Sequence, residues 1–241
     1  MEEKVIHNVN MGFNENVEIP FENIMNMEHP ELIMQKFEPF NRLMMEYRCA
    51  IMEIETKLKV LDEEFSLNHN RNPIEDIRTR IKTPVSIIDK MKRKGFPFSV
   101  KSIEENLFDV AGIRVICSFP EDIYTVKKML IRQDDITLLE EKDYIKNPKP
   151  NGYRSLHLIV GIPIFLATGK KEMKAEIQLR TIAMECWASL EHKMKYKKDI
   201  RNADEISRKL SHCAQISYEL DQEMQAIRNE IDIENPQRQY L

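Results

Sequence analysis

The spacing of apolar residues changes at Asp109, and this change constrains the fold of the chain most tightly. Upstream, apolar residues recur at three- and four-residue steps, which predicts a long amphipathic helix near residues 40–65. From Asp109 onward, β-branched and apolar runs of strand length alternate with helical spacing, beginning with "DVAGIRVICSF". This alternation predicts an α/β domain in which helices flank a mixed sheet of four or five strands, with long helices at both ends.

The remaining segments follow from spacing and from helix breakers. The Asn-rich stretch "NHNRNP" ends the first helix, and we expect a second helix near residues 74–94 that Pro84 kinks or divides. Further along we expect a helix in "IYTVKKMLIR", strands in "ITLLEEKDYI", "YRSLHLIVGIP" and "MKAEIQLRT", a helix in "IAMECWASLEHKMKY" and a last helix over 203–231. The last two strands are expected to be antiparallel neighbours joined across "FLATGKKE".

Three regions are expected along the chain. Residues 1–38 are Asn- and Met-rich and predict a poorly ordered or short-helical extension, residues 39–200 form the main domain, and residues 201–241 carry the C-terminal helix. The helices at both ends have more apolar surface than a small sheet needs. Ordinary packing on the domain and a subunit interface both explain this, so the C-terminal helix is a candidate oligomerisation element.

Composition excludes several classes of protein. The formal net charge of the 241 residues is −4, which is unlike the basic body of a general nucleic-acid binder, and no DNA partner is expected. No apolar run approaches the roughly 18 residues of a membrane span, and the N-terminus has no signal-peptide core. The cysteines are scattered without a CxxC pair, which predicts reduced thiols in a cytoplasmic protein.

Two carboxylates interrupt the apolar pattern of separate strands. Asp109 stands at the mouth of the first strand, where an isolated aspartate is usually a turn cap. Glu176 lies inside "MKAEIQLRT" and shares one strand face with Gln178 and Arg180, because side chains alternate with a period of two. Such a face is either solvated or lines a site, and two carboxylates from separate strands are ligands that Mg²⁺ accepts together with substrate phosphates.

Positive charge is concentrated between Arg78 and Lys101, against the single acid Asp89. The cations are Arg78, Arg80, Lys82, Lys90, Lys92, Arg93, Lys94 and Lys101. They form either a solvated helix face or a site for a phosphate-rich ligand, and an acidic chain that gathers its cations in one segment favours the ligand. RNA would suit this segment as well as a nucleotide does, so RNA binding stays open.

The stretch "KPNGYRSLHLIV" sets a turn directly before a strand. Tyr153 beside such a turn is often at the edge of a core, but next to Lys146 and Lys149 its ring can stack on a base. Arginine planes such as those of Arg80 and Arg114 can sandwich a base in a similar way. Carboxylates, a cationic segment and an aromatic ring together predict a nucleotide and metal site.

Four motifs in order resemble the synthetase domain of the RelA/SpoT family: "FDVAGIRVIC", "KPNGYRSLH", "AEIQLRT" and "AMECWASLEHKMKY". The chain is similar in length to the small alarmone synthetases, and among them to the RelP-type enzymes, and the similarity runs from about residue 40 to about residue 228. The resemblance implies a nucleotidyltransferase-like fold, with residues 39–200 as the synthetase domain. It also implies a GTP pyrophosphokinase that moves the pyrophosphate of ATP to the 3′-hydroxyl of GTP or GDP.

The resemblance also implies roles for individual residues. Asp109 and Glu176 match the Mg²⁺ ligands, and Glu176 also lies near the attacking hydroxyl as the candidate base. The residues implied for ATP binding are Arg80, Lys90, Arg93, Lys94 and Arg114, with Arg80 and Arg114 around adenine. Those implied for GTP or GDP binding are Lys146, Lys149, Tyr153, His157, Gln178, Arg180 and Glu185, with Tyr153 stacked on guanine and Glu185 at its N1–H and N2–H₂ edge.

Two further expectations come with the family. The long bifunctional relatives add a hydrolase domain with a His-Asp pair, which this chain lacks, so synthesis without hydrolysis is expected. A homotetramer built from the terminal helices is implied. Two other classes compete with this interpretation: a nucleotide- or RNA-binding regulator that keeps the fold without catalysis, and a nucleotidyltransferase that passes AMP to another acceptor.

Overall fold

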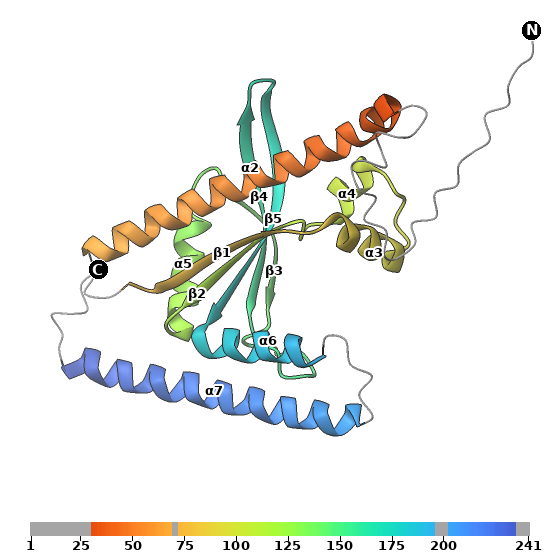
Figure 1. Ribbon diagram of the computed structural model, residues 1–241. Coiled ribbons are helices and arrows are strands. Elements are labelled where there is room, and N and C mark those ends of the chain that lie inside the picture. The colour runs from red at the N-terminus through yellow and green to blue at the C-terminus, as the bar shows by residue number, and fades with distance from the viewer. Residues whose placement is uncertain (1–29, 69–71, 196–201, 235–241) are drawn as a thin grey trace, which may run out of the picture. The chain divides into compact units, whose positions relative to one another are not determined.

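A five-stranded mixed sheet forms the centre of the protein. The computed structural model describes residues 30–68, 72–195 and 202–234 (Figure 1). The strands are β1 (Ile74–Ile81), β2 (Ala111–Cys117), β3 (Thr137–Asp143), β4 (Leu156–Leu166) and β5 (Gly169–Thr181), in the order β1-β2-β5-β4-β3. β2 and β5 are parallel and the other neighbours are antiparallel, which confirms the expected mixed sheet and the β4–β5 hairpin.

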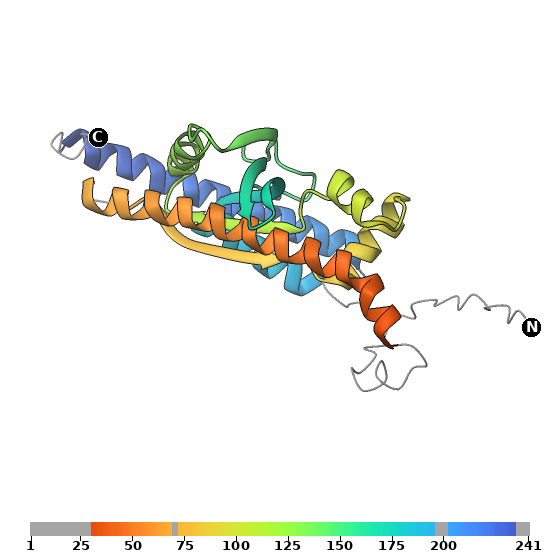
Figure 2. The same cartoon turned by 90° about the horizontal axis from the view of Figure 1, so that it is seen from above.

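Six helices accompany the sheet within the described residues. They are α2 (Pro30–Asn68), α3 (Pro84–Lys94), α4 (Val100–Asn106), α5 (Pro120–Leu130), α6 (Ile182–Lys195) and α7 (Ala203–Glu234). The chain divides into a unit that ends at Asn41 and one from Arg42 onward, which holds the whole sheet. α7 lies alongside α6 in both views of the fold (Figure 1, Figure 2).

The apolar face predicted for the first long helix is buried. Its buried members are Leu43, Tyr47, Ile51, Ile54, Leu58, Leu61 and Phe65. The helix begins at Pro30, ahead of the predicted start near residue 40, so it extends into the segment predicted to be poorly ordered or short-helical; residues 1–29 lie outside the described part of the chain. None of the described helices is long and apolar enough to cross a bilayer.

The helix expected over residues 74–94 is wrong in its first half. Residues Ile74–Ile81 form strand β1, which pairs with the buried strand β2 and obtains its backbone partners there. Helix α3 then starts at Pro84, with the Thr83 side chain accepting a hydrogen bond from the Ser86 N–H. Proline fits the first turn of a helix, where its missing N–H costs nothing, so Pro84 begins α3 and does not kink a longer helix. The short helix α4 was not expected.

Two faces of α7 differ in burial. Leu210 and Ala214 are buried in a cluster with Trp187 of α6, whose indole N–H donates to the Leu210 carbonyl at 2.9 Å. Further along the helix, apolar side chains are about half exposed: Leu220, Met224, Ile227 and Ile231. One face of α7 therefore packs on the domain, and Asp221 and Gln225 continue this buried face, whereas another face leaves an apolar stripe about half exposed within the described structure.

Candidate active site

One face of β5 carries three polar side chains that are hydrogen-bonded in series. The Gln178 amide donates to Glu176 Oε2 at 2.9 Å, and the Arg180 guanidinium donates to Gln178 Oε1 at 3.0 Å. This confirms that the three residues share a face, as the period of a strand predicts. The face is not merely solvated, since Arg180 is buried and Glu176 and Gln178 are partly buried.

A second set of contacts reaches Glu176 from β4 and from the turn before it. His157 Nδ1 lies 2.9 Å from Glu176 Oε1, and His157 Nε2 lies 2.8 Å from the Tyr153 hydroxyl. Arg180 in turn donates to that hydroxyl at 2.6 Å. Burial alone would raise the pKa of the Glu176 carboxyl, but the hydrogen bonds from His157 and Gln178 hold that pKa below its ordinary value.

Asp109 lies just before β2 and is held by two lysines. Lys82 Nζ and Lys90 Nζ contact its Oδ2 at 2.9 Å and 2.8 Å. Burial would raise the pKa of the Asp109 carboxyl, but the hydrogen bonds and charges of Lys90 and Lys82 lower it. Lys82 is not among the site residues predicted from the sequence, although it belongs to the basic segment.

The two carboxylates fit a divalent cation whose remaining ligands come from the substrate. Asp109 Oδ1 is buried without a hydrogen-bond partner, so one ligand atom is available. Charge repulsion from Asp109 also acts to raise the pKa of Glu176, so the two carboxylates lie within electrostatic range of one another. No three His, Cys, Asp or Glu side chains gather as a metal site among the described residues, so further ligands would come from phosphates and water.

An arginine-lined cavity of about 260 Å³ adjoins this face on the β1–β2 side of the sheet. It is lined by Arg78, Thr79, Arg80, Gly112, Ile113, Arg114 and Gln178. Arg80 pairs with Gly112 across the strands, and a Cβ on Gly112 would meet Arg80 Cγ and Nε at 3.2 Å. Gly112 therefore gives the Arg80 side chain the room to lie across β2.

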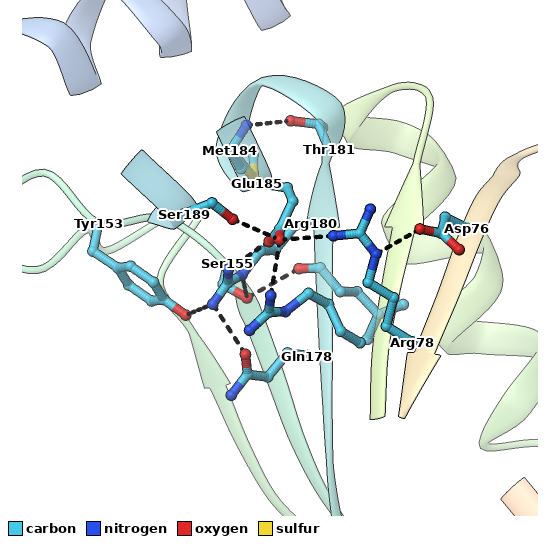
Figure 3. A network of polar contacts seen from close by, with 12 residues as sticks. Asp76, Arg78, Tyr153, Ser155, Gln178, Arg180, Thr181, Met184, Glu185 and Ser189 are labelled. Carbon is cyan, nitrogen blue, oxygen red and sulfur yellow. Dashed lines mark hydrogen bonds and ion pairs between the residues drawn. The ribbon is translucent and has the colours of Figure 1, made fainter. Parts of the chain in front are cut away.

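Glu185, in the first turn of α6, connects residues from both sides of the site (Figure 3). Its Oε1 accepts from Arg114 at 2.8 Å and from Ser189 at 2.9 Å, and its Oε2 accepts from Arg180 at 2.7 Å. Arg78 lies 3.5 Å from Oε1. Burial would raise the pKa of Glu185, but the hydrogen bond from Ser189 and the charges of Arg114 and Arg180 lower it. Glu185 is the residue predicted to bind the guanine edge, and both of its carboxylate oxygens are already hydrogen-bonded within the protein.

Aromatic rings form the other wall of the site. Lys149 Nζ lies 4.6 Å from the ring centre of Tyr144 and 4.7 Å from that of Tyr153. Tyr144 also meets the His157 ring edge-on at 5.2 Å and was missed in the sequence, where it ends a strand-like run. Lys146, by contrast, lies over a different tyrosine ring, at 5.1 Å.

The turn before Tyr153 requires glycine. Gly152 has φ +87°, and a Cβ there would meet the side chain of Ala214 on α7 at 2.5 Å. The Tyr153 N–H is held by Asn151 Oδ1 at 3.2 Å, which fixes where the ring leaves the turn. The sequence "NGY" therefore sets the direction of this ring.

Four basic residues near the site differ in their surroundings. Lys90 turns toward Asp109, whereas Arg93 and Lys94 are exposed on the last turn of α3. Arg154, the neighbour of Tyr153, donates to a backbone carbonyl at 2.9 Å and lies 4.0 Å above the ring of Tyr218 on α7. Its contacts hold α7 and the turn together, so Arg154 has a structural role.

Comparison with known proteins identifies the family. Residues 79–201 match the family described as the region found in RelA / SpoT proteins. The GTP pyrophosphokinase YwaC of Bacillus subtilis is 40% identical over 208 residues, which covers 86% of this chain and 99% of YwaC. The GTP pyrophosphokinase YjbM of the same organism is 36% identical over 192 residues, covering 80% of this chain and 90% of YjbM.

Solved structures agree with this assignment. Small alarmone synthetase 1 from Bacillus subtilis, bound to its product pppGpp, matches with a TM-score of 0.73 at 36% identity over 80% of this chain and 97% of its own. Small alarmone synthetase 2 from the same organism matches with a TM-score of 0.72 at 40% identity, over 80% of this chain and all of its own. The chain belongs to the RelA/SpoT family and has the fold of its small alarmone synthetases.

Proposed function

We propose that this protein is a GTP pyrophosphokinase that makes guanosine tetra- and pentaphosphate from ATP and GDP or GTP. The 3′-oxygen of the acceptor ribose attacks the β-phosphorus of ATP, the bond from that phosphorus to the α-phosphate oxygen breaks, and AMP leaves. The observation that carries the proposal is the pair Asp109 and Glu176, which lies between an arginine-lined cavity and an aromatic wall. Family membership supports the same reaction.

ATP is assigned to the arginine side. Arg80 and Arg114 flank adenine, since planar guanidinium groups stack well on aromatic rings. Lys90, with Arg93 and Lys94 further along α3, neutralises the phosphates. The exposure of Arg93 and Lys94 leaves them free to reach a ligand from the surface.

The guanosine nucleotide is assigned to the aromatic side. Tyr153 stacks on guanine, and Lys146 and Lys149 neutralise the 5′-phosphates. Glu185 accepts from the guanine edge once one of its arginine partners moves. The acceptor site around the 3′-hydroxyl is lined by His157 on β4 and by Gln178 and Arg180 on β5.

Catalysis rests on position and charge. Glu176 takes the proton of the 3′-hydroxyl, which contributes modestly, because a carboxylate is a weak base toward an alcohol. Asp109 and Glu176 would hold Mg²⁺, which would neutralise charge on the pyrophosphate and on the leaving AMP. Lys82 and Lys90 hold Asp109 ionised, so this oxygen ligand is ready for the cation.

Synthesis without hydrolysis is part of the proposal. The lack of a His-Asp dipeptide in the sequence supports it. Purified protein incubated with guanosine tetraphosphate and Mn²⁺ is expected to release no pyrophosphate. Detectable release would contradict this part alone.

We also propose a homotetramer that acts in the cytoplasm, where both nucleotide substrates are available. A groove of about 790 Å³ between α6 and α7 has an apolar lining that includes Leu190, Ile216 and Leu220. Burying such an uncovered stripe against another copy is favourable. Sedimentation at micromolar concentration tests this: a tetramer is expected, and a monomer would contradict it.

The reaction is tested by incubating γ-³²P-labelled ATP with GDP or GTP and Mg²⁺ and separating the products. Label is expected on a guanosine tetra- or pentaphosphate, and Glu176→Gln is expected to abolish it. A folded protein that binds both nucleotides but makes no product would favour a regulator that kept the fold. That alternative is weakened by the presence of both Asp109 and Glu176, which a binding protein does not require.

A further inference from the structure

Arg180 is the centre of a hydrogen-bond network that ends on the catalytic carboxylate. It is only 5% exposed, and its guanidinium donates to Glu185 Oε2 at 2.7 Å, Tyr153 Oη at 2.6 Å and Gln178 Oε1 at 3.0 Å. Figure 3 shows these contacts converging on one side chain. A guanidinium only donates, so the Glu185, Tyr153 and Gln178 oxygens are the acceptors in these three bonds.

The first arm runs through Tyr153 and His157. The ionised Glu176 carboxylate only accepts, so the neutral His157 ring donates to it from Nδ1. Nε2 is left to accept from the Tyr153 hydroxyl, 2.8 Å away, whose oxygen accepts from Arg180. The proton of the neutral ring is thus on Nδ1, which donates to Glu176 Oε1 at 2.9 Å. The Tyr153 hydroxyl stabilises this tautomer, the one that can hold Glu176.

The second arm runs through Gln178. Its Oε1 accepts from Arg180, so the amide NH₂ is turned toward Glu176 and donates to Oε2 at 2.9 Å. Each oxygen of the carboxylate therefore receives one hydrogen bond, and both originate at the same guanidinium. A carboxylate fixed at both oxygens cannot rotate, and its remaining lone pairs keep one direction.

We propose that Arg180 and the Tyr153 hydroxyl are positioning groups for Glu176, separate from the stacking of the Tyr153 ring on guanine. The inference rests on the proposed function, in which Glu176 faces the 3′-hydroxyl. Glu185 holds Arg180 in place and also binds Arg114 at 2.8 Å, so the network extends to the ATP side of the site. The catalytic carboxylate is thus aligned through protein groups that contact both substrates.

Tyr153→Phe separates the two roles, because it keeps the ring and removes the hydroxyl. We expect kcat to fall about tenfold, as for the loss of one aligning hydrogen bond, with the KM of the acceptor within about twofold of wild type. Tyr218→Phe, which keeps the ring beneath Arg154, is the matched control and should leave kcat unchanged. An unchanged kcat in Tyr153→Phe, or a loss confined to KM, would overturn the proposal.

A double variant tests whether the two arms hold the same group. If both arms are needed to align Glu176, breaking one arm already loses the alignment. Gln178→Leu added to Tyr153→Phe should then lower kcat only about threefold beyond the worse single variant. A loss equal to the product of the single effects would mean independent roles and would refute the network.

The tautomer is measurable without any activity. In wild-type protein labelled with ¹⁵N-histidine, the neutral His157 ring is expected to carry its proton on Nδ1. A proton on Nε2 would contradict the network. This spectrum needs no substrate, so a wrong tautomer counts against the network alone. Failure of the proposed reaction would be seen separately, as wild-type protein that makes no product.

Discussion

Asp109 and Glu176 are two carboxylates of one site that the protein holds in opposite ways. Asp109 has both its partners, Lys82 and Lys90, on a single oxygen, while the other oxygen is buried and unpartnered. Glu176 has one hydrogen bond on each oxygen, from His157 and from Gln178. Ammonium groups fix charge without fixing direction, whereas a hydrogen bond on each oxygen fixes direction.

This difference separates two tasks. Asp109 is kept ionised and has a free oxygen, which suits a ligand for a cation that arrives with phosphates. Glu176 is kept aligned, which suits a group that must face one hydroxyl.

A third carboxylate, Asp221 on α7, is held in neither of these ways. It accepts from the Thr181 hydroxyl at 2.7 Å, and burial raises its pKa to about 6.

The largest expected effects come from the two carboxylates themselves. Asp109→Asn and Glu176→Gln should each lower the rate of synthesis about a thousandfold or more, since each removes a charge that acts in the transition state. They should differ in binding of ATP without metal. Asp109→Asn should bind it at least about threefold more tightly than wild type, because a negative charge beside two lysines is gone. Calorimetry in the presence of EDTA measures the affinity for ATP. Equal affinities in the two variants would contradict the proposed difference between the two carboxylates.

Removing one partner of each carboxylate should give intermediate effects of different kinds. Lys82→Met should raise the KM of ATP about tenfold with a smaller change in kcat, because it removes charge from the phosphate region. Lys101→Met, which alters an exposed lysine of the same basic segment, is its control and should change neither constant by more than about twofold.

His157→Asn should do the reverse of Lys82→Met. It removes a group that aligns Glu176, so kcat should fall about tenfold or more while the KM of ATP stays near that of wild type. Steady-state kinetics with both substrates varied separates the constants. If both partner variants changed the same constant, the contrast between charge and direction would fail.

The smallest expected effect concerns Asp221. Its pKa in the folded protein, about 6, is above the ordinary value, so the folded state binds the proton more tightly and stability falls as pH rises through this range. Asp221→Asn removes the buried charge and can still accept from Thr181. Its melting temperature should exceed that of wild type by a few degrees at pH 8, corresponding to about 1–2 kcal/mol, and by less as pH falls toward 4. A gap that widens at low pH would contradict the sign.

Much of the site follows from local sequence patterns. Alternation along "AEIQLRT" predicts that Glu176, Gln178 and Arg180 share a face, because a strand has a fixed period. The "NG" pair before Tyr153 predicts a tight turn, and the structure confirms a glycine with positive φ. Such features depend on a few neighbouring residues, so the chain itself contains the information.

The features that the sequence misses depend on distant pairing. "IEDIRTRI" was expected to be helical, but its pairing with the buried strand β2 makes it β1. The contact of Lys82 with Asp109 and that of Arg114 with Glu185 join residues 27 and 71 positions apart. In each pair the two residues belong to separate segments of the sequence, so the role of Glu185 as a link between arginines emerges only from the fold.

The central claim is that pyrophosphate, and not AMP, moves to the acceptor. The most direct measurement is ³¹P NMR of the purified product of a reaction with ATP, GDP and Mg²⁺, with the phosphorus–proton coupling to the ribose traced. We predict a diphosphate whose first phosphorus couples to H3′ of guanosine, with one AMP released for each product molecule. An adenylylated acceptor with free pyrophosphate would contradict the claim and make the chain a nucleotidyltransferase of another kind.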